Sequence, residues 1–172
     1  MFMIPNLISL SRIIFIFPII LFIMLNKVNL AILFFFIASF TDFLDGYIAR
    51  FLNQESILGA NLDLLADKIF VCSLLVFISF HFDNFIFLLM TILILSRELS
   101  IGSIRQYLMQ TEKENKAKVN FLGKCKTFFQ FFSLGFAIIF LDSEYSEIVE
   151  LLIITTAILS WLSLINYTYA RD

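Results

Sequence analysis

Four aspartates lie in two short stretches of an otherwise apolar sequence. Asp42 and Asp45 are three residues apart, and Asp63 and Asp67 are four residues apart. In an α-helix these separations place both carboxylates of a pair on one face, with about 4.5 and 6 Å of axial rise between them. Carboxylate ligands with no histidine or cysteine nearby favour Mg²⁺ or Mn²⁺ over zinc, and facing pairs can bridge two ions about 3.5–4 Å apart. The spacing therefore predicts a site for one or two hard cations.

Small residues and an arginine accompany the aspartates at helical spacing. Gly46 and Ala49 follow the first aspartate pair, and Arg50 comes directly after Ala49. Gly59 precedes the second pair by one helical turn. Glycine and alanine let either a neighbouring helix or a ligand approach the backbone closely. Taken singly, each small residue favours helix packing, whereas the combined pattern favours a binding pocket beside the carboxylates.

The composition indicates that the solvent for most of this protein is lipid. Hydrophobic residues make up 60% of the chain and charged residues 15%, against roughly 45–50% and 25% in a soluble domain. The mean hydropathy of +0.95 excludes disorder, and the formal net charge of −2 excludes a strongly basic nucleic-acid binder. Cys72 and Cys125 show no metal or redox spacing, so both are predicted to be free thiols.

Charged and small polar residues divide the sequence into six apolar segments. A helix of about 20 residues crosses the hydrocarbon core of a bilayer, so six such helices use most of the 172 residues. The predicted fold class is all-α, with one membrane domain over residues 1–172 built as a polytopic bundle of six transmembrane helices. The predicted spans are 7–26, 29–50, 61–81, 84–107, 121–141 and 148–169.

The distribution of basic residues predicts that both termini are cytoplasmic, because short loops rich in Lys and Arg stay on that side. All four aspartates then fall in the cytoplasmic third of the bilayer, where two separate segments converge. Lys27 alone falls outside the cytoplasmic side. The basic residues assigned to that side are Arg12, Arg50, Lys68, Arg97, Arg105, Lys113, Lys116, Lys118, Lys124, Lys126 and Arg171.

Carboxylates within membrane spans require compensation. A centrally placed Asp costs about 2.5–3.5 kcal/mol, so four of them cost on the order of 10 kcal/mol if nothing offsets them. A small transporter whose buried acids bind a translocated cation is one interpretation. It accounts for acids in the spans, but not for their convergence on one membrane face or for the spacing of the glycines and the arginine.

The stretch TDFLDGYIARFLNQESILGANLDLLADK resembles the signature of the CDP-alcohol phosphotransferase family, membrane enzymes that make phospholipids from a CDP-linked donor. All eight signature positions match: Asp42, Asp45, Gly46, Ala49, Arg50, Gly59, Asp63 and Asp67. Further segments resemble one branch of the family, the phosphatidylglycerophosphate synthases. These segments are IPNLISLSRII, the ADK after the last signature position, SRELSIGSIRQ and GKCKT.

The resemblance implies transfer of a phosphatidyl group from CDP-diacylglycerol to glycerol 3-phosphate with release of CMP, at an active site facing the cytoplasm of a bacterial-type cell membrane. It implies that Asp42, Asp45 and Asp63 hold two Mg²⁺ or Mn²⁺ ions. Asp67, also near the metals, is the candidate general base that takes the proton of the acceptor. The implied lining of the CDP pocket is Gly46, Ala49, Arg50 and Gly59, with Arg50 as a phosphate fork.

Glycerol 3-phosphate is a dianion and needs its own cationic site. The candidate residues are Arg97, Arg105, Lys124 and Lys126, all in the cytoplasmic half by the orientation argument. The alternative for the lysines is an ordinary basic region beside the membrane that attracts anionic lipid headgroups. The alternative for Arg97 is a simple ion pair with its neighbour Glu98.

Two questions stay open at this point. The signature serves the CDP-linked half of the reaction, so the acceptor can instead be phosphatidylglycerol, inositol phosphate or serine. Arg12 stands alone in an apolar segment and is placed either at the headgroup region or at the active site.

The resemblance also implies a homodimer, with CDP-diacylglycerol, the acceptor and membrane lipid as partners and no nucleic acid.

Overall fold

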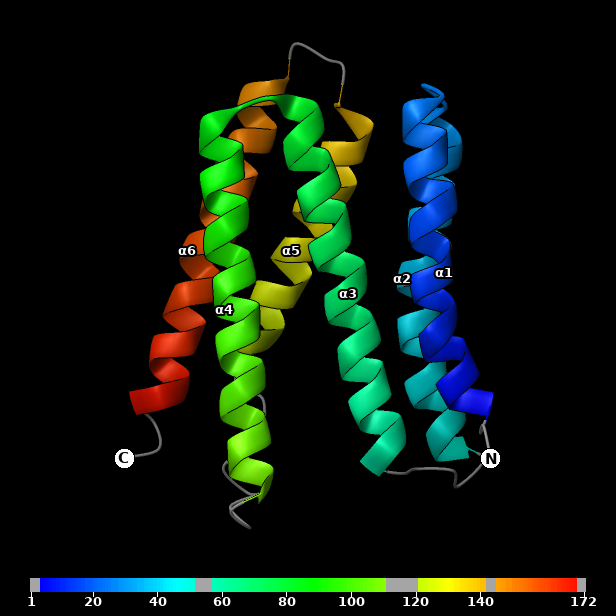
Figure 1. The fold of residues 1–172 in the computed structure, drawn as a ribbon, viewed down its shortest axis with the longest axis vertical. Helices are drawn as coiled ribbons and strands as arrows, with labels where there is room; N and C mark the ends of the chain where they lie inside the picture. Colours follow the sequence, from blue (N-terminus) through cyan, green and yellow to red (C-terminus); the bar gives the residue numbers. More distant parts are fainter. Residues whose placement is uncertain (1–3, 52–56, 111–120, 142–144, 170–172) are drawn as a thin grey trace. The chain divides into compact units, whose positions relative to one another are not determined.

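The computed structural model describes residues 4–51, 57–110, 121–141 and 145–169. Within these residues the chain forms six α-helices and no strand, which confirms the all-α prediction. Each predicted span coincides with one helix (Figure 1). The helices are α1 (Ile4–Met24), α2 (Val28–Phe51), α3 (Ile57–Phe82), α4 (Phe85–Gln110), α5 (Phe121–Ile139) and α6 (Ser146–Tyr169).

Three of these helices are long and apolar enough to cross a membrane, over Asn6–Met24, Phe85–Ile104 and Glu147–Tyr167. Large apolar side chains also cover the surface, among them Phe17, Phe80 and Phe85, which are at least 73% exposed. Soluble proteins rarely expose contiguous apolar patches, since apolar surface in water is costly. The chain is therefore a helical membrane protein, and its long helices present apolar faces to lipid.

The chain divides within α3 into two compact units, Met1–Phe77 and Ile78–Asp172. In the first unit α1 packs along α2 as a helical hairpin (Figure 1). The turn between them is a Schellman cap, in which Asn26 N donates to Ile23 O (2.9 Å) and Lys27 N donates to Phe22 O (2.8 Å). Asn26 has a positive φ of 53°, a conformation that asparagine tolerates better than most residues.

The core of the first unit follows the helical repeat. Buried apolar residues recur at spacings of three and four along each helix, so each helix presents an apolar stripe to the core. The rings of Phe35 on α2 and Phe70 on α3 stack with centroids 5.9 Å apart, which ties the third helix to the hairpin. The buried apolar residues are Ile16, Ile19, Ile23, Ala31, Phe35, Ala38, Ala66, Phe70, Val71, Leu74 and Leu75.

In the second unit α6 packs against both α4 and α5. Asn84 caps α4, because its Oδ1 accepts the backbone N–H of Ile86 at 2.8 Å. The indole Nε1 of Trp161 on α6 donates to the carbonyl of Leu93 on α4 at 3.1 Å. Between α5 and α6, the buried hydroxyls of Ser133 and Thr156 share a hydrogen bond of 2.7 Å. Side-chain polar contacts therefore supplement apolar packing at both helix interfaces.

Candidate functional site

The second aspartate pair lies on α3 at the spacing that the sequence predicts. Gly59, Asp63 and Asp67 occupy three successive turns of this helix, so the two carboxylates share one face. The side chain of Asp63 is 44% exposed and that of Asp67 is 30% exposed. Both side chains therefore stay partly exposed, although Asp67 Oδ1 itself is buried, and carboxylates of this kind suit a hard cation.

The first aspartate pair belongs to α2, together with three of the residues predicted to line the CDP pocket. The backbone of all five lies in the C-terminal half of the helix, which ends at Phe51. Their side chains lie outside the described residues, so the predicted pocket stays a prediction. These five residues are Asp42, Asp45, Gly46, Ala49 and Arg50.

Arg12 on α1 reaches the aspartates of α3. Its Nη2 donates a hydrogen bond to Asp63 Oδ1, and its Nη1 lies 3.9 Å from Asp67 Oδ1. The guanidinium is completely buried. The sequence left the place of Arg12 open between the headgroup region and the active site, and the structure puts it against the predicted site. The available signal was a lone charge in an apolar helix, which indicates a partner but does not identify it.

A second charged cluster lies in the second unit and joins α4, α5 and α6. Glu98 Oε1 accepts from Arg97 Nη1 at 3.1 Å and from Lys126 Nζ. Arg97 Nε also donates to the carbonyl of Ser160 at 2.9 Å, and its Nη2 to Ser163 Oγ at 3.1 Å. The three charged side chains are no more than 9% exposed. This confirms the pairing of Arg97 with Glu98 that the sequence allowed and adds Lys126 to it.

The structure therefore separates the residues predicted to bind the acceptor phosphate. Arg97 and Lys126 are buried on Glu98, whereas Lys124 is exposed on α5. The backbone of Arg105 lies in α4, and its side chain lies outside the described residues. Four basic residues that the orientation argument assigns to the cytoplasmic side also lie outside the described residues. They are Lys113, Lys116, Lys118 and Arg171.

The described side chains alone do not form a complete metal centre. Among them, no group of three or more His, Cys, Asp and Glu residues is close enough to hold an ion. Two of the four predicted ligands, Asp63 and Asp67, belong to this part of the chain. Their donor atoms are carboxylate oxygens on partly exposed side chains, a set that fits Mg²⁺ or Mn²⁺.

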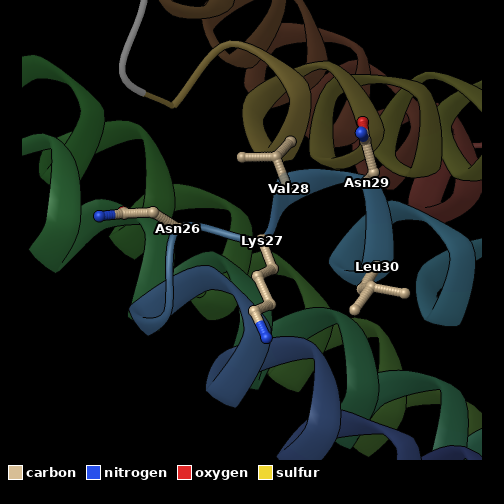
Figure 2. Close-up of a pocket in the computed structure, with 5 residues that line it drawn as sticks. All are labelled: Asn26, Lys27, Val28, Asn29 and Leu30. Atoms are coloured by element: carbon tan, nitrogen blue, oxygen red, sulfur yellow. The ribbon is translucent and has the colours of Figure 1, made fainter.

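A pocket of about 340 Å³ lies at the turn of the α1–α2 hairpin, at the other end of α1 from its N-terminal half, where Arg12 contacts the aspartates of α3. Residues Asn26 to Leu30 line it, and Figure 2 shows that their side chains point in different directions rather than converging. Arg12 precedes the end of α1 by 12 residues, or about 18 Å of helix. This pocket is therefore distant from the aspartates of α3 and contains no predicted site residue.

A sequence model of the CDP-alcohol phosphatidyltransferase family matches residues 2–166 of this chain. The chain belongs to this family. Membership covers five of the described helices completely and nearly all of the sixth. The resemblance that the Asp, Gly and Arg signature indicates is thereby confirmed, and this chain is an enzyme of the family.

Three relatives that match most of the chain share one name, CDP-diacylglycerol–glycerol-3-phosphate 3-phosphatidyltransferase. The protein from Haemophilus influenzae is 38% identical over 136 residues, which cover 78% of this chain and 73% of the relative. The protein from Escherichia coli K12 is 33% identical over 138 residues, covering 78% and 75%. The protein from Shigella flexneri serotype 5b is 30% identical over 174 residues, covering 98% and 94%.

Proposed function

We propose that this chain transfers a phosphatidyl group from CDP-diacylglycerol to sn-glycerol 3-phosphate, releasing CMP and forming phosphatidylglycerophosphate. The observation that carries the proposal is the match to relatives with this named activity over most of both chains. The Asp, Gly and Arg signature accounts for the CDP-linked half of the reaction. The segments SRELSIGSIRQ and GKCKT favour glycerol 3-phosphate as the acceptor.

The reaction requires an oxygen of the acceptor to attack the phosphatidyl phosphorus while the bond to CMP breaks. Asp67 takes the proton of the attacking hydroxyl, which suits a carboxylate that keeps part of its surface exposed. Asp42, Asp45 and Asp63, with Asp67 beside them, hold the metal ions. Two Mg²⁺ or Mn²⁺ ions supply charge neutralisation at the phosphate oxygens and at the departing CMP.

The donor nucleotide lies against the small residues of the signature. Gly59 stands one turn before Asp63 on α3 and has no side chain to block an approach to the backbone. Gly46 and Ala49 serve in the same way on α2, and Arg50 forks a phosphate of the donor. This arrangement keeps the diphosphate beside the carboxylates that hold the metal.

The acceptor phosphate binds to cations that belong to α4 and α5. Arg105 and Lys124 contact it directly, and exposure of Lys124 supports this role. Arg97 and Lys126 contribute from the buried cluster around Glu98, where each supplies a positive charge. Positive charge favours an anionic ligand.

The chain forms one membrane domain over residues 1–172, in which all six helices cross the membrane and both termini are cytoplasmic. The active site then faces the cytoplasm of a bacterial-type cell membrane, where water-soluble glycerol 3-phosphate is available. The protein works as a homodimer in this proposal. The excess of basic residues on one side supports the orientation, and a reporter fused at Asp172 tests it.

The deciding experiment measures CMP release by purified protein in detergent with CDP-diacylglycerol and Mg²⁺. Glycerol 3-phosphate, phosphatidylglycerol, inositol phosphate and serine are added one at a time. Release that needs glycerol 3-phosphate and stops with a chelator supports the proposal. Stimulation by another acceptor overturns the acceptor assignment but keeps the aspartate mechanism. If folded protein releases no CMP with any acceptor, the proposed reaction is wrong and the cation-transporter interpretation is favoured instead.

A further inference from the structure

The buried face of α1 changes character along its length. In its N-terminal half the buried residues are polar, Asn6, Ser9 and Arg12, each separated by three positions. Towards the C-terminus the same helix buries Ile16, Ile19 and Ile23. An all-apolar face would pack α1 into the hairpin at lower cost, since buried polar groups require partners. The polar half therefore marks the part of α1 that faces something other than apolar side chains.

Arg12 is the charged member of this polar face, and it contacts two of the signature carboxylates together. One terminal nitrogen binds Asp63 and the other lies 3.9 Å from Asp67. The two aspartates are one turn apart on α3, so a single side chain reaches both only if it carries two separate donor groups. The planar guanidinium has this geometry, and a lysine ammonium has one donor centre.

Burial shows from which side the arginine approaches. The Arg12 side chain is fully buried, whereas the two carboxylates keep 44% and 30% of their surface exposed. The guanidinium therefore contacts the carboxylates from the interior and leaves their outer surface accessible. Like charges one turn apart on a helix repel, and a cation behind them offsets the repulsion without covering the outer surface.

We infer that Arg12 is a positioning residue for the metal site, in which its guanidinium holds Asp63 and Asp67 in the geometry that a divalent cation requires. The inference rests on the proposed function, because it assumes that these carboxylates bind metal. It extends the site to α1, a helix that contributes none of the eight signature residues. A merely structural role, in which Arg12 only attaches α1 to α3, predicts no change in metal affinity.

The test is Mn²⁺ binding to full-length purified protein in detergent, without substrates, measured by electron paramagnetic resonance. We expect Arg12→Lys and Arg12→Gln to weaken Mn²⁺ binding about tenfold or more, because neither side chain spans both carboxylates. The matched control is Ile19→Ala, which loosens the same buried face of α1 two turns further along. Its Mn²⁺ affinity should stay within about twofold of the wild type.

A second readout separates positioning from a general loss of structure. The Mg²⁺ concentration for half-maximal CMP release should rise about tenfold in Arg12→Lys, while turnover at saturating Mg²⁺ recovers to within about threefold of the wild type. Arg12→Lys keeps the positive charge, so its Mn²⁺ affinity and Mg²⁺ dependence still test the inference if Arg12→Gln does not fold.

Three outcomes overturn the inference. Wild-type Mn²⁺ affinity in Arg12→Lys would mean that charge alone is sufficient. Equal or tighter binding by Arg12→Gln would mean that the guanidinium does not organise the site. An equal loss in Ile19→Ala would assign the effect to helix packing. Failure of the wild-type protein to bind Mn²⁺ is a different result, because it removes the metal proposal itself.

Discussion

Two clusters of this protein join arginine to carboxylates, and they differ in the exposure of the acids. In the first unit, Arg12 is buried while Asp63 and Asp67 keep 44% and 30% of their side-chain surface exposed. In the second unit, Glu98 is only 9% exposed and is enclosed by Arg97 and Lys126. The same pairing of charges therefore leaves acids accessible in one place and enclosed in the other.

This difference separates carboxylates that can bind a ligand from a carboxylate that joins helices. The side chains of Asp63 and Asp67 keep accessible surface where a cation can approach. Glu98 receives hydrogen bonds from α4 and α5, while Arg97 continues the connection to the carbonyl and hydroxyl of two serines on α6. A buried charge in such a network is costly to leave without its partner. We therefore expect loss of activity from the first cluster and loss of stability from the second.

The largest effect is expected from Asp67→Asn. Loss of a general base typically lowers turnover about 10²–10⁴-fold, and asparagine keeps the size of the side chain. Mn²⁺ binding should weaken far less than turnover falls, because three aspartates remain to hold the metal. Steady-state CMP release and Mn²⁺ binding measured on the same preparation test both statements.

The control for this prediction is Asp83→Asn, at an exposed position in the turn between α3 and α4. Asparagine tolerates the positive φ of 45° at this residue, so turnover should not change. Near-normal turnover in Asp67→Asn would exclude Asp67 as the base and leave it as a ligand only.

The second prediction concerns the enclosed cluster. Glu98→Gln leaves two cations without their shared counter-charge, and removal of one partner from a buried ion pair costs about 3–5 kcal/mol. Unfolding in detergent, followed by fluorescence of Trp161, measures this cost. Trp161 is the single tryptophan of the chain and is hydrogen-bonded between α6 and α4, so it reports on this unit.

Glu147→Gln is the control for the buried position, because Glu147 is exposed in the first turn of α6. Its loss should cost no more than about 1 kcal/mol through the helix dipole. Equal destabilisation by the two substitutions would refute the structural role of Glu98 and break the comparison between the clusters.

The elements of the fold were largely predictable, because apolar runs end at charged residues that cannot continue across lipid. The predicted span 84–107 corresponds to α4 at Phe85–Gln110, and the span 148–169 to α6 at Ser146–Tyr169. The span predicted from residue 61 begins earlier, at Ile57, because the sequence before it contains Gly59 but no proline to stop a helix. The shared face of Asp63 and Asp67 was also predictable, because residues four positions apart lie on one side of an α-helix.

The partners of the buried charges were less predictable. The pairing of Arg97 with Glu98 joins adjacent residues, so the sequence allowed it. Arg12 and Asp63 are 51 positions apart, and Lys126 and Glu98 are 28 apart. Neither pairing follows from periodicity within a helix, since each depends on how two helices pack. Exposure is likewise a property of packing, so the sequence did not distinguish Lys126 from Lys124.

A third prediction extends the comparison to the acceptor. Arg105→Ala should raise the KM for glycerol 3-phosphate about 10–100-fold, because a hydrogen bond to a charged group contributes about 1.5–3 kcal/mol. The KM for CDP-diacylglycerol should stay within about twofold. Lys27→Ala, at the α1–α2 turn, removes a cation that is distant from the aspartates of α3 and should change neither constant. Equal increases in both constants for Arg105→Ala would refute an acceptor-specific role.

The smallest effect on stability is expected from an uncharged hydrogen bond that, like the charged cluster, joins two helices of the second unit. Thr156→Val removes the buried hydrogen bond to Ser133 Oγ and should lower the free energy of unfolding by about 1 kcal/mol, without changing turnover. Thr155→Val is the matched control, since Thr155 Oγ1 donates to the carbonyl of Leu152 within α6 at 2.8 Å. A double-mutant cycle of Ser133→Ala with Thr156→Val isolates the coupling across the interface. Coupling near zero would mean that this pair does not help to hold α5 on α6, and the charged cluster would then be the main polar connection of the unit.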